Sequence, residues 1–134
     1  MRLWHQSLIP YLPRQQLLGQ HRECCALRGK GWGKKHSVVD YIFTYAPDEL
    51  IAYHYLVMDE MIARGYHPDE IWRAPEWRGS PLGEDKGWSY QEPVNDIYDC
   101  NGMIYDEHNK TYLLECIENL ESKGIDTTEK RKLI

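Results

Sequence analysis

The stretch PRQQLLGQHRECCALRG, residues 13–29, decides the fold of this chain. Pro13 suits the first turn of a helix, where its missing backbone N–H costs nothing. Gly29 is a typical residue at which a helix stops. Between them, leucine, cysteine and alanine side chains offer apolar surface for burial, and we expect a helix from about Pro13 to Leu27.

Two further stretches have helical character. One runs from about Pro47 to Arg64, where acidic residues in the first turn favour the helix dipole and Gly65 provides a stop. The other runs from about Asp106 to Lys123, where leucine and isoleucine recur with the helical period before another glycine.

The remaining segments contain many turn residues. Periodicity does not decide between a short strand and a helical turn for residues 37–43. Residues 73–104 hold several prolines and glycines, and we expect an irregular segment packed by tryptophan and tyrosine rings. We expect residues 127–134 to form a frayed tail. The expected class is all-α, a single compact domain over residues 1–134 with about three main helices and long irregular loops.

Length and composition indicate the number of domains and the cellular location to expect. With 134 residues, it suits one domain with a modest core. No apolar run approaches the ~20 residues of a membrane span. The start has no signal-peptide pattern, so we expect a cytoplasmic protein, associated with the nucleoid if it binds DNA, whose cysteines stay reduced.

Charge is distributed unevenly along the chain. The net charge is −5, but residues 1–36 carry seven basic residues against the single acid Glu23, whereas residues 37–134 carry nine bases and twenty acids. This asymmetry favours a basic face that meets a polyanion such as nucleic acid. A solvated basic face without a partner is the alternative.

A glycine-rich basic segment, GKGWGKKH at residues 29–36, follows the first helix. Glycines allow backbone N–H groups to approach phosphate closely, and cationic side chains neutralise its charge. Trp32 would either stack on a base or cap the core. The candidate phosphate contacts from this segment and the preceding turn are Arg28, Lys30, Lys34, Lys35 and His36.

Histidine and cysteine residues raise the question of a metal. A site sketched from His21, Cys24 and Cys25 lacks a second ligand pair at finger-like spacing, so we favour buried thiols and expect no metal and no cofactor. His54 lies on an apolar helical face, where a hydrogen-bonded core histidine is the favoured interpretation over a ligand.

A carboxylate and an amine together suggest reaction chemistry. Gln16, Gln20 and Glu23 share one face of the first helix, which places Glu23 on a polar stripe. We expect Met1 to be retained because Arg2 is bulky. An α-amine has a pKa of ~7.7–8.0, so part of it is the free base that attacks an aldehyde or a sugar C1′. A nearby carboxylate would stabilise the developing cation and move protons.

The chain resembles the pyrimidine dimer DNA glycosylase and abasic-site lyase family of the phage endonuclease V type, in its bacterial branch. The resemblance rests on the order and spacing of four segments, which are residues 20–23 (QHRE), the basic segment 29–36, residues 64–66 (RGY) and residues 76–79 (EWRG). It extends from residue 1 to about residue 80.

The resemblance implies a compact helical fold with the N-terminus lodged between helices. It implies that the Met1 amine attacks C1′, forms an imine and then cleaves by β-elimination, with Glu23 as catalytic carboxylate. The implied partner is double-stranded DNA with damaged or abasic sites, bound by a monomer. The DNA-contacting residues it suggests, beyond those of the basic segment, are Arg2, Gln16, His21, Arg22 and Arg78.

Two other functions remain open from the residues. One is a non-catalytic nucleic-acid-binding module that uses the basic segment from 22 to 36. The other is a structural or partner-binding helical domain.

Overall fold

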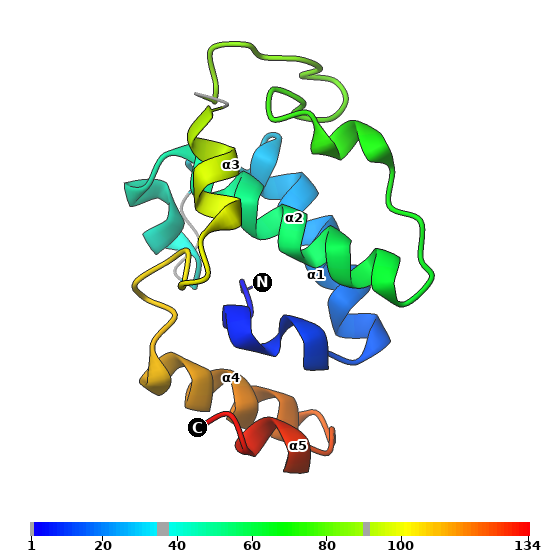
Figure 1. Ribbon diagram of the computed structural model, residues 1–134, viewed down its shortest axis with the longest axis vertical. Coiled ribbons are helices and arrows are strands. Elements are labelled where there is room, and N and C mark those ends of the chain that lie inside the picture. The colour runs from blue at the N-terminus through cyan, green and yellow to red at the C-terminus, as the bar shows by residue number, and fades with distance from the viewer. Residues whose placement is uncertain (1, 35–37, 90–91) are drawn as a thin grey trace.

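The computed structural model describes residues 2–34, 38–89 and 92–134, and within these ranges the chain is helical with no strand. The expected all-α class is therefore confirmed. In chain order the elements are η1 (Gln6–Tyr11), α1 (Arg14–Arg28), η2 (Asp40–Thr44), α2 (Pro47–Ala63), η3 (Glu70–Arg73), α3 (Glu92–Asp99), α4 (Lys110–Ser122) and α5 (Thr128–Arg131) (Figure 1).

The first two predicted helices are confirmed with nearly the expected bounds. α1 ends where Gly29 N–H bonds the carbonyls of Cys25 and Ala26. α2 ends where Gly65 adopts a φ of 87° and Tyr66 N–H reaches back 2.8 Å to the Met61 carbonyl. Such a left-handed residue after a helix satisfies carbonyls that the helix leaves open.

The third predicted helix corresponds to α4 and begins later than expected, at Lys110. The Asn109 side chain accepts a hydrogen bond from Tyr112 N–H at 2.9 Å, and this N-cap fixes the start. The expectation that the helix begins at Asp106 missed this cap.

Two expectations about irregular segments need correction. In residues 73–104 the expected aromatic packing is observed, since Trp88 and Tyr98 pack against the α2 cluster, but the segment also contains α3, whose Pro93 stands in the first turn and whose Val94 packs against α2. Residues 127–134 contain α5 and are not a frayed tail, because Glu121 accepts two hydrogen bonds from Arg131, at 2.7 and 2.8 Å. The segment left open between strand and helical turn is 3₁₀-helical from Asp40 to Thr44.

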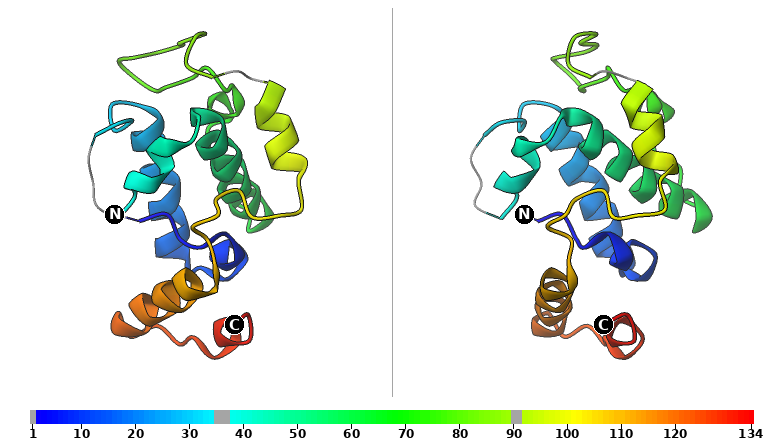
Figure 2. Two further views of the ribbon diagram at one scale, coloured as in Figure 1. Left: turned by 90° about the vertical axis from the view of Figure 1, so that its left-hand side faces the viewer. Right: turned by 60° about the vertical axis from the view of Figure 1, so that its left-hand side comes forward.

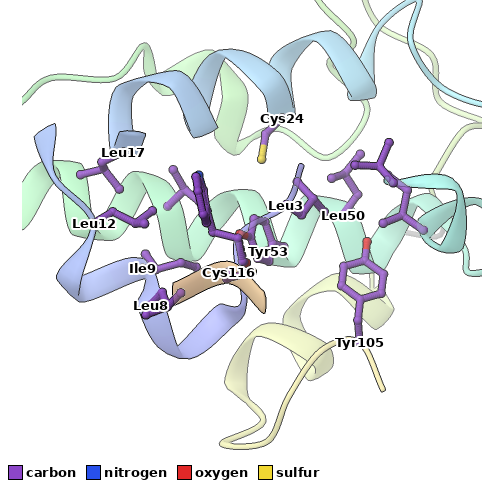
Figure 3. Close-up of a cluster of buried hydrophobic side chains, with 14 of the residues drawn as sticks. Leu3, Leu8, Ile9, Leu12, Leu17, Cys24, Leu50, Tyr53, Tyr105 and Cys116 are labelled. Carbon is purple, nitrogen blue, oxygen red and sulfur yellow. Dashed lines mark hydrogen bonds between the residues drawn. The ribbon is translucent and has the colours of Figure 1, made fainter. Parts of the chain in front are cut away.

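The main core lies between α1, α2 and α4 and includes the start of the chain. Leu3 is fully buried there with Leu17 of α1, Tyr53 of α2 and Cys116 of α4 (Figure 3). Figures 1 and 2 show the N-terminal segment and η1 lying between the α1–α2 pair and α4. The expected lodging of the chain start between helices is thus observed from Arg2 onward.

None of the helices in the described ranges combines the length and the apolar character required to cross a membrane.

Candidate active site

A pocket of about 780 Å³ opens beside the N-terminal segment. Four parts of the chain form its walls. They are Arg2 and Trp4, one face of α1 with the turn before it, Val38 ahead of η2, and the C-terminal end of α4 with the residue that follows Gly124. The lining residues are Arg2, Trp4, Pro13, Gln15, Gln16, Gly19, Gln20, Arg22, Glu23, Val38, Asn119, Lys123 and Ile125.

The carboxylate of Glu23 faces this pocket from α1. Its Oε2 atom is buried and has no hydrogen-bond partner within the described ranges. A buried carboxylate oxygen without a donor is costly, and a catalytic role is one of the reasons for which proteins keep such a group. The sequence-based placement of Glu23 on a polar stripe of the first helix is consistent with this position.

Cations surround the same pocket. Arg22 is exposed, and no ion pair forms between it and any described residue. Arg2 is held more firmly, because its guanidinium donates to Cys116 Sγ at 3.7 Å and lies over the Trp4 ring at 5.7 Å. The Lys123 Nζ lies 5.3 Å from the same ring. The pocket therefore attracts an anion while leaving the Arg22 guanidinium available for one.

Of the residues predicted to bind DNA, Arg2, Gln16 and Arg22 line this pocket. Lys30 and Lys34 are exposed in the turn after α1 but do not line it. Met1, Lys35 and His36 lie outside the described residues.

The prediction that Arg28 contacts DNA is wrong in this structure. Its side chain has no exposed surface, and its guanidinium donates to the carbonyls of Trp72, Ala74 and Trp77 at 2.7 to 3.1 Å. A further N–H lies 2.9 Å from His54 Nδ1. Arg28 therefore fastens the segment after α2 to the end of α1.

His21 is also turned away from the pocket. Because Arg28 only donates hydrogen bonds, His54 Nδ1 accepts, and His54 Nε2–H then donates to His21 Nδ1 at 2.8 Å. Burial lowers the pKa of both rings, and the nearby Arg28 charge lowers it further. The interpretation of His54 as a hydrogen-bonded core histidine is confirmed.

Arg78 and Trp32 also have structural partners. Arg78 donates to the carbonyls of Arg28 and Gly29 at 2.9 and 3.1 Å, and its guanidinium lies 4.7 Å from the Trp88 ring centroid. Trp32 is half-buried and meets Trp88 edge-on at 5.8 Å. The alternative in which Trp32 caps the core is the one observed, and the contacts of Arg78 with DNA stay a prediction.

Two glycines of the basic segment, Gly29 and Gly31, serve close backbone packing. A Cβ at Gly31 would lie 2.8 Å from the Ala26 carbonyl oxygen, to which Gly31 N–H donates at 2.9 Å. A Cβ at Gly29 would lie 2.9 Å from the Arg78 carbonyl oxygen. Since these N–H groups are already bonded, they do not form the phosphate cradle expected from the sequence.

A metal site is disfavoured at the one group of candidate ligands found within the described ranges. It consists of His21, Cys25 and His54. Cys24, which the sequence-based set included, is not part of this group because it is buried in the core. Coordination by His54 Nε2 would move that ring's proton to Nδ1, which would then face the Arg28 donor. Burial also raises the pKa of the Cys25 thiol to about 11, so the thiolate that a metal needs is scarce at neutral pH.

Sequence reasoning missed the wall that α4 contributes. Asn119 lines the pocket, and its buried Oδ1 has no hydrogen-bond partner in the described part of the chain. Lys123 lines the pocket as well. No local motif marks these two residues, since they reach the site only through the packing of α4 against the start of the chain.

The fold and the pocket define a class of small helical proteins that present a buried carboxylate among cations. A family model described as pyrimidine dimer DNA glycosylase matches residues 1–74. The chain belongs to the pyrimidine dimer DNA glycosylase family, which makes it a DNA repair glycosylase with DNA as its substrate. A search of curated proteins and a search of solved structures each found no significant match.

The family match covers the N-terminal segment, α1 and α2. It ends before α4, so Asn119 and Lys123 belong to a part of the pocket that the match does not include.

Proposed function

We propose that this glycosylase is also an abasic-site lyase that uses the Met1 α-amine as its nucleophile on pyrimidine dimers or other damaged bases. The observation that carries the proposal is the position of Glu23. Its Oε2 is buried, has no hydrogen-bond partner among the described residues, and faces a pocket whose wall includes Arg2 and Trp4, which closely follow Met1 in the sequence.

The first step of the proposed reaction is attack of the neutral amine on C1′. The amine nitrogen forms a bond to C1′, the glycosidic C1′–N bond breaks, and the base leaves with the electron pair and takes up a proton. Loss of the proton from the bound amine and opening of the sugar ring then give an imine between Met1 and C1′. The Glu23 carboxylate stabilises the cationic character that develops at C1′.

The second step is β-elimination. A base removes a proton from C2′, the C3′–O bond breaks, and the 3′ phosphate leaves with the electron pair. Glu23 is suited to accept that proton because no described residue occupies its Oε2. Arg22, exposed at the pocket and free of an ion pair with other described residues, is suited to bind a phosphate beside the lesion.

Trapping by borohydride tests the proposal. Protein with its native start is mixed with DNA that contains either an abasic site or a cyclobutane dimer, and borohydride reduces any imine to a stable amine. We expect a covalent complex whose cross-link maps to residue 1. A protein with extra residues before Met1 is the matched control and should give no such complex.

The Glu23→Gln variant separates chemistry from binding. We expect DNA affinity to be retained and turnover to fall by about 10²–10⁴-fold, the usual contribution of acid–base catalysis. Absence of a trapped complex with the native start would refute the amine mechanism, and full activity of Glu23→Gln would remove Glu23 from it.

A further inference from the structure

The side chain of Gln20 binds the N-terminal segment in the way a neighbouring strand would. Only 2% of Gln20 is exposed. Its Oε1 accepts a hydrogen bond from Trp4 N–H at 2.7 Å, and its Nε2 donates to the Arg2 carbonyl oxygen at 3.0 Å. One side chain thus satisfies a donor and an acceptor of the same short extended segment.

The orientation of this amide is determined by its partners. If the amide were turned over, its NH₂ group would face the Trp4 N–H, and its oxygen would face the Arg2 carbonyl. The Tyr53 hydroxyl of α2 lies 2.6 Å from the Trp4 carbonyl oxygen and 2.9 Å from Gln20 Oε1, and its single proton goes to the nearer Trp4 carbonyl.

A third helix completes the hold on this segment. The Tyr112 hydroxyl of α4 donates to the Leu3 carbonyl oxygen at 2.5 Å. The backbone from Arg2 to Trp4 therefore receives hydrogen bonds from α1, α2 and α4, although it belongs to no helix or strand. Of these anchors, Gln20 makes the bond nearest to the start of the chain.

Gln20 and Glu23 lie three positions apart on α1, and both line the pocket. Neighbours at this spacing lie on one face of a helix. The same helix face therefore carries the catalytic carboxylate and the group that holds the Arg2 carbonyl, one peptide away from the amine of Met1.

We infer that Gln20 is a positioning residue of the reaction, which directs the Met1 amine toward the Glu23 side of the pocket by holding Arg2 and Trp4. The inference rests on the proposed function and adds a residue to it. Displacement of a reacting group by about 1 Å costs on the order of 10²-fold in rate, so loss of this hold should slow chemistry more than it weakens DNA binding.

Two substitutions test the inference by single-turnover trapping on abasic-site DNA. Gln20→Met keeps the length and loses both hydrogen bonds, and we expect the rate at saturating protein to fall about 10²-fold while the dissociation constant for DNA changes less than about twofold. Gln20→Glu keeps the acceptor for Trp4 N–H, so it also serves if the methionine variant folds poorly.

The Gln20→Glu variant has a signature that a general structural role would not produce. Its ionised carboxylate places an oxygen against the Arg2 carbonyl, whereas its protonated form donates an O–H there as the amide does. We therefore expect its rate, relative to wild type at each pH, to recover as the pH falls through the pKa of residue 20.

Arg64→Met is the matched structural control. Arg64 donates to the carbonyls of Pro10 and Leu12 at 3.0 and 2.7 Å, which anchors η1 without touching residues 2–4. We expect this variant to lose stability while its trapping rate stays within about twofold of wild type.

The outcomes distinguish the role of Gln20 from the proposed amine mechanism. Adduct formation by wild type together with unchanged rates in both Gln20 variants, or losses no larger than that of Arg64→Met, would overturn the role of Gln20 alone. Absence of an adduct from wild type would overturn the proposed function and this inference with it.

Discussion

Lowering the pH from 8 to 5 should destabilise the protein by about 2 kcal/mol through His108 alone. The ring of His108 is 2% exposed. Its Nδ1 accepts from Gln6 N–H at 3.1 Å, so the neutral ring carries its proton on Nε2, which lies 2.7 Å from the Tyr41 hydroxyl oxygen. A second proton on Nδ1 would break the bond to Gln6, just beyond the N-terminal segment.

The magnitude follows from the pKa of His108 in the two states. Burial, with the charge of neighbouring His5, lowers this pKa to about 3, against 6.5 for an ordinary histidine. Between these values the unfolded chain binds a proton that the folded chain does not. The stability is therefore complete above pH 6.5 and is lost as the pH falls toward 3, at about 1.4 kcal/mol per pH unit well inside the window.

Urea unfolding of wild type, His108→Gln and His67→Gln at several pH values between 8 and 5 measures this contribution. We expect the change in unfolding free energy across the range to be smaller by about 2 kcal/mol in His108→Gln than in wild type. Substitution of the exposed His67 is the matched control and should leave the change as it is. A constant difference between wild type and His108→Gln at every pH would refute the reasoning.

Three further predictions concern α1 and the turn that follows it. Arg28→Met should cost about 3–5 kcal/mol of unfolding free energy, because it leaves buried acceptors without a donor, and should leave the salt dependence of DNA binding unchanged. Arg22→Met should leave the unfolding free energy nearly unchanged and should reduce the slope of log affinity against log salt by about 0.9. Equal slopes for wild type and this variant would exclude a phosphate contact. Gly31→Ala should cost about 1–3 kcal/mol in urea unfolding because its Cβ meets the Ala26 oxygen, whereas Gly19→Ala, whose Cβ has ordinary contacts, should stabilise by about 0.5–1 kcal/mol. Shifts of the same sign in both glycine variants would contradict the packing argument.

The sequence predicts α1 and α2 well because their ends carry local signals. Gly29 and Gly65 stop these helices through bonds to residues within one turn, and such bonds depend on nothing distant. The placement of Glu23 follows from helical periodicity in the same way. Local signals also caused one error. The prolines and glycines of residues 73–104 favoured an irregular segment, whereas Pro93 in fact stands in the first turn of α3, a position that proline suits.

The error over Arg28 shows where composition misleads. Arg22 and Arg28 belong to one basic segment, yet six positions on a helix rotate a side chain by about 240°, so the two face different surroundings. The number of basic residues in this part of the chain does not indicate which face of α1 packs against α2. A helical projection alone would have separated the two arginines, although it would not have identified the carbonyls that Arg28 binds.

The α4 wall of the pocket depends on contacts that no local signal predicts. Asn119 and Lys123 are about a hundred positions from the residues they face, and their place depends on how α4 packs over the start of the chain. The part of the pocket wall that Asn119 and Lys123 form thus comes from the region beyond residue 74, where the family match ends.

The start of the chain has two roles at once, and this joins stability to the proposed chemistry. Leu3 and Trp4 are 0% and 5% exposed, and burial of one such side chain contributes about 1.5–3 kcal/mol. The segment that supplies this core surface also leads directly to the amine. Its backbone is held by Gln20, Tyr53 and Tyr112, so the freedom that an ordinary chain terminus retains is already lost before DNA binds. Under the proposed function, this held backbone at residues 2–4 lowers the ordering cost of an attack on C1′ by the amine that precedes it in the chain.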